Sequence, residues 1–232
     1  MTEAGPGRGG RDGTVAEPAR VLPTALRVWL WPIASLAALV VVALGVLYAG
    51  DSAPGRVDSW VVDPTADSVG QPWRGIALVI DFLGGFVGSA VLVAAAVTGC
   101  LLLRRPRAAV LVVAGVALTV GTGTLIKPLV GRTIHGPENL SYPSGHTAFL
   151  TALALVLALL AVGRLGLGGA AGTGLMLAAA LVAGAVMGWA QVALSAHYAT
   201  DVLGGWCTAL AVVPVTAWLV DRAADAARRD RR

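Results

Sequence analysis

The chain has little charge for its length: Asp, Glu, Lys and Arg make up 13% of its 232 residues, whereas 56% are hydrophobic. A soluble domain carries about a quarter charged residues, so this composition excludes an ordinary soluble fold. The mean hydropathy of +0.77 agrees. Several apolar runs reach the roughly 20 residues that a helix needs to cross a bilayer. Because backbone groups in lipid must be bonded within their own segment, we expect these runs to be helices.

Cysteine is scarce too, with only Cys100 and Cys207. Both fall inside apolar runs, and neither has a second ligand residue at C-x-x-C spacing. The sequence therefore implies neither a disulfide framework nor a cysteine metal site. We expect both side chains to fill space in the protein core.

The apolar runs predict an all-α, polytopic membrane bundle of about six transmembrane helices. The predicted spans are residues 26–49, 76–103, 108–126, 147–162, 173–194 and 200–220. Residues 1–25, rich in Gly, Ala, Pro and Arg, are predicted to be a disordered cytoplasmic segment. The membrane domain is then 26–220, and residues 221–232 form a basic cytoplasmic tail.

The basic residues are distributed unevenly between the two predicted membrane faces. With both termini in the cytoplasm, only four of the 17 Lys and Arg residues lie outside, namely Arg56, Arg74, Lys127 and Arg132. This asymmetry satisfies the positive-inside rule. Topology therefore explains the net charge of +4, and no nucleic-acid partner is expected. The arginines at 228–232 could contact anionic lipid headgroups, but an anchor set by topology is the simpler interpretation.

Histidine and lysine are also rare, and they gather around two short motifs. The motifs are Pro-Ser-Gly-His at 143–146 and His-x-x-x-Asp from His197 to Asp201. His135 and the only lysine, Lys127, precede them closely. All of these residues fall at ends of predicted spans on the outer face. A histidine at an interface is, taken alone, more often structural, but this combination favours phosphoryl transfer.

The chemistry of these residue types fits an anionic phosphate. Ser144, Gly145 and His146 open a predicted helix, whose first N–H groups are free to bind an anion. Gly145 would allow close approach of the backbone, and Ser144 can cap the helix or donate to phosphate. His146 can protonate a leaving oxygen. Asp201 lies four residues after His197, on the same helical face, and can orient that histidine for nucleophilic attack.

These motifs resemble those of the type 2 phosphatidic acid phosphatase family. Its signature has three blocks, K-x6-R-P, P-S-G-H and S-R-x5-H-x3-D. This chain reads KPLVGRTIH from Lys127, PSGH from Pro143 and AQVALSAHYATD from Ala190. The resemblance implies that His197 forms a phosphohistidine, that Asp201 orients it and that His146 is the acid. It also implies phosphate contacts from Lys127, Ser144 and Gly145, and neither a metal nor another cofactor.

The chain departs from the family signature at two arginines. Ile134 and His135 stand where the first block has Arg-Pro, and Gln191 stands where the third block has Arg. A lost charge-assisted contact costs about 1.5–3 kcal/mol. Arg132 lies two positions before the expected arginine, and we predict that it binds the phosphate instead. His135 could add a donor, with an exposed loop histidine as the simpler interpretation.

Two further groups of acidic residues lie near the outer face. Asp81 falls inside the second predicted span, where an ionisable residue suggests a function, although snorkelling to the interface explains it equally well. The outer segment 51–74 carries four aspartates, and we expect a solvated loop there. They are Asp51, Asp58, Asp63 and Asp67.

The sequence therefore predicts a multi-pass phosphatase of the cell membrane whose substrate is a lipid phosphate. Both a phosphomonoester and a diphosphate, on an isoprenoid or a glycerolipid, fit the motifs, with the active site facing the periplasm or exterior. The alternative is a non-catalytic membrane protein that binds lipid phosphates or assembles a complex, for which the missing arginines are the evidence. No oligomeric state is predicted.

Overall fold

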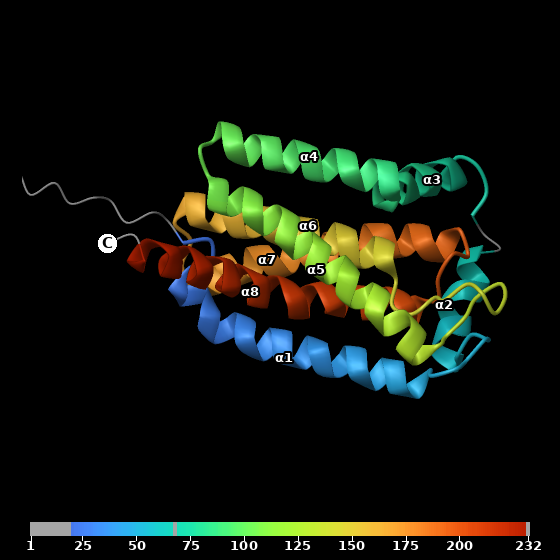
Figure 1. Ribbon diagram of the computed structural model, residues 1–232. Coiled ribbons are helices and arrows are strands. Elements are labelled where there is room, and N and C mark those ends of the chain that lie inside the picture. The colour runs from blue at the N-terminus through green and yellow to red at the C-terminus, as the bar shows by residue number, and fades with distance from the viewer. Residues whose placement is uncertain (1–19, 67–68, 231–232) are drawn as a thin grey trace, which may run out of the picture.

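The protein is described by a computed structural model that covers residues 20–66 and 69–230. Over these residues it is 79% helical, without strands (Figure 1). The helices are α1 (Thr24–Leu47), α2 (Arg56–Ala66), α3 (Trp73–Gly84), α4 (Phe86–Leu102), α5 (Pro106–Val130), α6 (Gly145–Leu165), α7 (Gly169–Ala193) and α8 (Ala199–Arg229).

The number of membrane spans agrees with the prediction of about six. Within the described residues, α1, α5, α6, α7 and α8 are each long and apolar enough to cross a bilayer, and α3 with α4 makes a sixth candidate. Large apolar side chains point away from the bundle: Leu36 and Leu39 of α1 are 64% and 66% exposed. Such surfaces are expected where lipid replaces water.

The second predicted span, 76–103, is not one straight helix. The chain bends by 62° between α3 and α4. The helix breaks there because Gly85 has extended backbone angles of φ −68° and ψ 170°. A Cβ on Gly88 would lie 2.1 Å from the carbonyl oxygen of Phe82. Glycine at position 88 therefore permits the tight fold that turns α3 over the end of the bundle.

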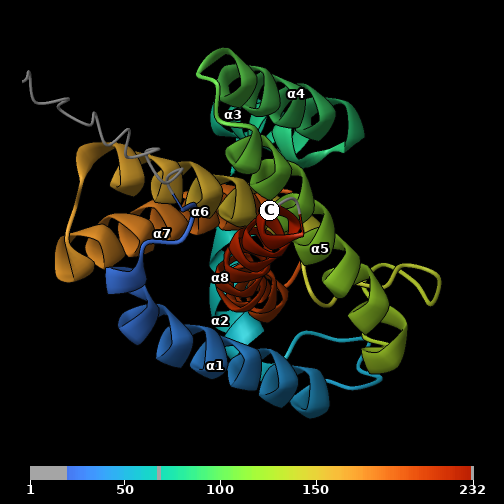
Figure 2. The same cartoon turned by 60° about the vertical axis from the view of Figure 1, so that its left-hand side comes forward.

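Helix α8 occupies the centre of the bundle and packs against α1, α5, α6 and α7 (Figure 2). Small residues let the helices approach closely at the start of α8. A Cβ on Gly205 would lie 2.3 Å from the carbonyl oxygen of Ser144, and one on Gly204 would meet the ring of Tyr142 at 2.4 Å. This packing joins the beginnings of α6 and α8, which carry the two histidine motifs.

The boundaries of the predicted terminal segments differ from the structure. Residues 1–19 of the segment predicted to be disordered lie outside the described residues, while Val21 and Leu22 are buried. Their backbone N–H groups donate to the Asp221 carboxylate at 2.9 and 3.0 Å. The predicted boundary at residue 221 also falls inside a helix, since α8 continues to Arg229. Cys100 and Cys207 are both buried, as predicted for core fillers.

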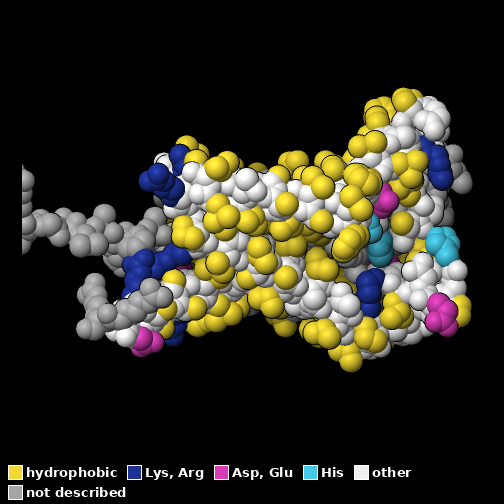
Figure 3. Space-filling view, turned by 45° about the horizontal axis from the view of Figure 1, so that its top comes forward, with side chains coloured by type: hydrophobic (Ala, Val, Ile, Leu, Met, Phe, Trp, Pro, Cys, Tyr) yellow, Lys and Arg dark blue, Asp and Glu magenta, His cyan; other side chains and the backbone are white. Residues whose placement is uncertain are grey.

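The bundle has two ends of different character. The histidine end holds α2, α3 and the segments 131–144 and 194–198, and the arginine end holds residues 20–22, 103–107 and 222–229. On the face shown in Figure 3, histidine side chains occur at one end only, basic side chains occur at both ends, and the surface between them is largely hydrophobic. That distribution is typical of a protein with a membrane-embedded middle.

Candidate active site

The start of α6 has the helix-capping geometry predicted from the Pro-Ser-Gly-His motif. Ser144 is the N-cap residue, and its hydroxyl oxygen accepts the N–H of Thr147 at 3.4 Å. The backbone N–H of Ser144 donates to the carbonyl oxygen of Asp201 at 2.9 Å. A Cβ on Gly145 would meet nothing within 4 Å, so space remains in front of the first turn of α6.

His197 lies next to Asp201, as the four-residue spacing predicts. Its Nδ1 is 3.6 Å from Asp201 Oδ2, and the Asp201 side chain is completely buried. The second contact of Oδ2 is with the backbone N–H of Tyr198 at 3.1 Å. Among the described residues, Nδ1 is buried and has no hydrogen-bond partner, so its nearest polar contact is this carboxylate at ion-pair distance. The carboxylate is therefore positioned to orient the ring and leave Nε2 for chemistry.

Arg132 is placed behind this pair, with its side chain completely buried. Its Nη1 donates to Asp201 Oδ1 at 2.7 Å and to the hydroxyl of Thr200 at 2.6 Å, and its Nη2 donates to Asp58 at 2.6 Å. The guanidinium carbon lies 4.2 and 4.5 Å from the ring centroids of Tyr48 and Tyr198. We predicted a phosphate contact for Arg132, whereas these contacts place both terminal nitrogens on the protein's own side chains.

The prediction of a solvated acidic loop is wrong for Asp58. This residue lies in α2 with no exposed surface, and it receives the backbone N–H and the hydroxyl of Thr200, each at 2.9 Å. It thus binds the first turn of α8 as well as Arg132. Nothing in the local sequence distinguishes Asp58 from the neighbouring aspartates, because its partners lie 74 and 142 positions away.

The second histidine is held by residues from other helices. His146 Nε2 lies 3.5 Å from Asp81 Oδ1, with side-chain exposures of 32% and 36%. The amide of Gln191, which is buried, donates to the same oxygen at 2.7 Å. The His146 ring packs on the end of α3, since a Cβ on Gly84 would lie 2.5 Å from its Cδ2. Asp81 therefore contacts side chains of both α6 and α7.

The single lysine completes the cluster. Lys127 Nζ donates to the carbonyl oxygens of Leu140 at 2.5 Å and Ser141 at 3.3 Å. These carbonyl groups lie just before Ser144, whose N–H donates to the carbonyl oxygen of Asp201 at the start of α8. The structure therefore brings the four charged or titratable residues of the motifs together.

His135 and Tyr198 lie beside this cluster and have other contacts. His135 is exposed, and its Nε2 bonds the carbonyl oxygen of Ser195 at 2.7 Å, which joins two loops, as expected for a loop histidine. Burial raises the pKa of the Tyr198 phenol, so its ring stays neutral beside Arg132. Among the described residues, no three His, Cys, Asp or Glu side chains converge in a way that could hold a metal ion.

An apolar groove runs along the membrane-facing side below this cluster. It has a volume of about 760 Å³ and lies between α4 and α5. Phe86 lines it where α4 begins after the break, and Phe149 lines it from α6, one turn after His146. The groove opens to the lipid-facing surface rather than to a loop.

Fold and site together define a multi-pass helical membrane protein with a two-histidine site at one end. The sequence matches the family model of the PAP2 superfamily over residues 124–225. That range contains all three motif blocks, and the family resemblance inferred from them is confirmed.

The fold is also similar to a solved structure. That structure is described as the first transmembrane PAP2 type phosphatidylglycerolphosphate phosphatase from Bacillus subtilis. The TM-score is 0.56 at 19% identity, covering 82% of this chain and 94% of that one. At this identity the similarity establishes the fold. A comparison of the sequence with curated proteins gives no match.

Proposed function

We propose that the protein is an integral membrane phosphatase that hydrolyses a phosphomonoester or diphosphate of an isoprenoid or glycerolipid through a phosphohistidine. The observation that carries the proposal is the convergence of the His197–Asp201 pair, 3.6 Å apart, with the start of α6, where Ser144 bonds Asp201 and Lys127 bonds the carbonyl of Ser141. The solved relative, described as a phosphatidylglycerolphosphate phosphatase, supports a lipid phosphate as substrate.

In the first step, Nε2 of His197 attacks phosphorus, and the bond from phosphorus to the leaving oxygen breaks. Asp201 holds the Nδ1 proton and stabilises the positive charge that develops on the ring. His146 gives its proton to the leaving oxygen. In the second step, water attacks phosphorus, the bond from phosphorus to Nε2 of His197 breaks, His146 takes a proton from that water, and inorganic phosphate leaves.

Positive charge for the phosphate comes from few groups in this proposal. Lys127 uses two of its three N–H donors on backbone carbonyls, which leaves one for a phosphate oxygen. The free backbone N–H groups at Gly145 and His146 supply further donors. Ser144 is buried and bonded to Thr147, so it contributes by capping the helix. No step is assigned to a metal ion.

Arg132 and Asp81 are positioning residues in this mechanism. Arg132 ties Asp201 to Asp58 and so fixes the carboxylate that orients His197. Asp81 supplies a negative partner to the protonated His146 ring. Gln191, at the position of a family arginine, bonds Asp81 and adds no charge. The arginine lost from the third block is therefore replaced by a neutral contact.

The groove between α4 and α5 supports a substrate with a membrane-embedded tail. Its lining is apolar and includes Phe149, which lies one helical turn after His146 in α6. A lipid whose phosphate reaches the histidine end could keep its chain in this groove. The positive-inside distribution supports placing that end at the extracytoplasmic face.

The second candidate function is a non-catalytic receptor for lipid phosphates. It is favoured by one observation, since the only arginine near the first motif block is committed to Asp58 and Asp201. Against it stands the retained geometry of His197, Asp201 and His146, which a binding protein would not need.

The test is phosphate release by the detergent-purified protein, in EDTA, from a panel of prenyl and glycerolipid phosphates. His197→Ala should reduce release at least about a thousandfold and abolish acid-labile phosphate on the protein. His135→Ala is the matched control, since that exposed histidine bonds only a loop carbonyl, and it should behave like the wild type. A folded protein that binds these lipids but releases no phosphate would establish the receptor function instead.

A further inference from the structure

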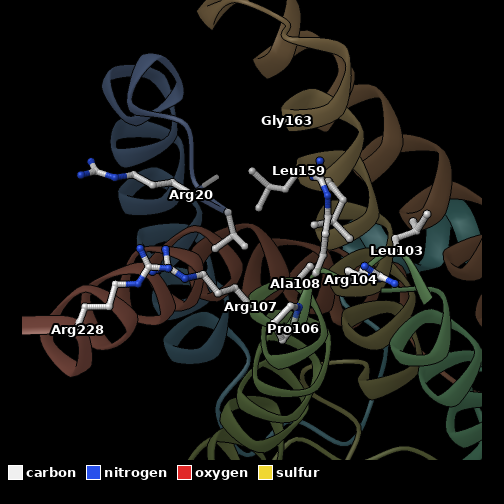
Figure 4. A pocket seen from close by; sticks show the side chains of 12 residues that line it. Arg20, Leu103, Arg104, Pro106, Arg107, Ala108, Leu159, Gly163 and Arg228 are labelled. Carbon is white, nitrogen blue, oxygen red and sulfur yellow. The ribbon is translucent and has the colours of Figure 1, made fainter. Parts of the chain in front are cut away.

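A cavity lined by arginines lies at the arginine end, far from the histidines. It has a volume of about 350 Å³, and it is formed by the segment before α1, the turn from α4 to α5, the end of α6 and the end of α8. Its basic lining residues come from three of these segments (Figure 4). They are Arg20, Arg104, Arg105, Arg107 and Arg228.

One side of this cavity is a fixed structure. Asp221, which is 2% exposed, binds the backbone before α1 and lies 3.9 Å from Arg107. Arg107 also donates to Asp225 at 3.4 Å, and Arg20 lies 4.0 Å from the same carboxylate. These contacts hold the segment before α1, α5 and α8 in one arrangement.

The cavity carries more positive than negative charge. Among the described residues, Arg20 and Arg107 pair with Asp221 and Asp225, whereas Arg104, Arg105 and Arg228 form no ion pair with a carboxylate. Arg107 and Arg228 extend toward one another from α5 and α8 (Figure 4). Like charges that converge on one cavity repel, and an anion between them would remove that repulsion.

The remaining lining is apolar, which indicates the kind of anion. Leu103, Leu159 and Leu160 line the cavity beside the arginines, and Leu103 is itself 55% exposed at the bundle surface. A site for a free anion needs no such surface. A phospholipid presents both features, a negatively charged phosphate at the headgroup and a hydrocarbon chain directly below it.

We propose that this cavity binds the headgroup of an anionic phospholipid from the leaflet at the arginine end. The phosphodiester would lie against Arg104, Arg105 and Arg228, with the first part of an acyl chain on Leu103 and Leu159. The site is separate from the proposed phosphatase site and does not depend on it. A bound lipid would stabilise the packing between the segment before α1, α5 and α8.

The experiment is thermal unfolding of the full-length protein in neutral detergent, titrated with phosphatidylglycerol, phosphatidylcholine or inorganic phosphate. The test variant is Arg104→Gln with Arg105→Gln, because neither arginine has an ion-pair partner in residues 20–66 or 69–230 whose loss would disturb the fold. Arg164→Gln is the matched control, an exposed arginine at the same end that does not line the cavity. Lys127→Gln controls for lipid bound at the histidine end.

We expect phosphatidylglycerol to raise the unfolding temperature of the wild type, Arg164→Gln and Lys127→Gln at similar concentrations. The double variant should need at least about tenfold more lipid, since each charge-assisted contact is worth about that factor. Equal responses of the double variant and the wild type would overturn the proposal, as would equal stabilisation by phosphatidylcholine. An equal effect of inorganic phosphate would show a free-anion site and overturn the lipid assignment.

Discussion

The two histidines of one site are held in opposite ways. His197 contacts Asp201, which pairs with Arg132, and Arg132 in turn pairs with Asp58. These three charged side chains have no exposed surface. His146 meets a single carboxylate, Asp81, that is about one-third exposed and lies near the end of α3, just before the break. The difference matches the proposed roles, because a nucleophile needs a fixed line of attack, whereas a proton donor must reach both a leaving group and a water molecule.

Among changes to the residues that support the two histidines, removing Arg132 should have the largest effect. In Arg132→Leu, Asp58 and Asp201 would remain as buried carboxylates without their shared partner, which costs about 3–5 kcal/mol. We expect a clear fall in the unfolding temperature of the detergent-purified protein, together with loss of phosphate release.

Two further variants keep this prediction testable. Arg56→Gln, at an exposed position of the same helix as Asp58, should leave both measurements unchanged. Arg132→Lys keeps the charge but loses the bidentate contact. Its unfolding temperature and its rate of phosphate release should lie between those of Arg132→Leu and Arg56→Gln. If Arg132→Leu melted at the wild-type temperature, the buried network would contribute nothing to stability.

Asp81→Asn should separate activity from stability. The residue is partly exposed, so we expect an unfolding temperature close to that of the wild type and a rate of phosphate release about a hundredfold lower, within the range for general acid catalysis. The effect should shrink with an aryl phosphate, whose leaving oxygen needs little protonation. Glu138→Gln, an exposed acid at the same end, is the control, and an equal loss on alkyl and aryl substrates would contradict the acid-positioning role.

Gly84→Ala should reduce phosphate release less than Arg132→Leu or Asp81→Asn. The added methyl carbon would lie 2.5 Å from His146 Cδ2, so the ring must move away from its place beside Asp81. A small misplacement of a reacting group is expensive, and we expect phosphate release to fall about tenfold. Gly99→Ala, in α4, has nothing within 4 Å of the new carbon and should be neutral; similar rates for both variants would show that the ring tolerates displacement.

The comparison of the two histidines also separates what the sequence could predict from what it could not. Apolar length predicted the bundle, and the motif spacings predicted that His146, His197, Asp201 and Lys127 would lie together. The spacing of His197 and Asp201 is a local pattern, because a helix repeats every 3.6 residues, whereas Lys127 and His146 were placed by the span ends at one membrane face. Even the capping role of Ser144 follows from three consecutive residues.

The residues that support the histidines were harder to predict. Arg132 meets Asp58 across 74 positions, and Gln191 meets Asp81 across 110. Such pairs depend on how α2 and α3 fold over the bundle, and α3 is placed by the break at Gly85 that hydropathy does not reveal. Arg132 illustrates the limit well, since the motif spacing predicted its proximity to the site but not the direction in which its guanidinium points.

Helix α8 carries a buried carboxylate near each end, Asp201 at the histidine end and Asp221 at the arginine end. Asp221 accepts two backbone N–H groups of the segment before α1, and Asp201 accepts the guanidinium of Arg132, which follows α5. In a helix, one inserted or deleted residue rotates everything beyond it by about 100° and shifts it by about 1.5 Å. The stretch between the two aspartates therefore has a fixed length, and it can vary in sequence far more freely than in its number of residues.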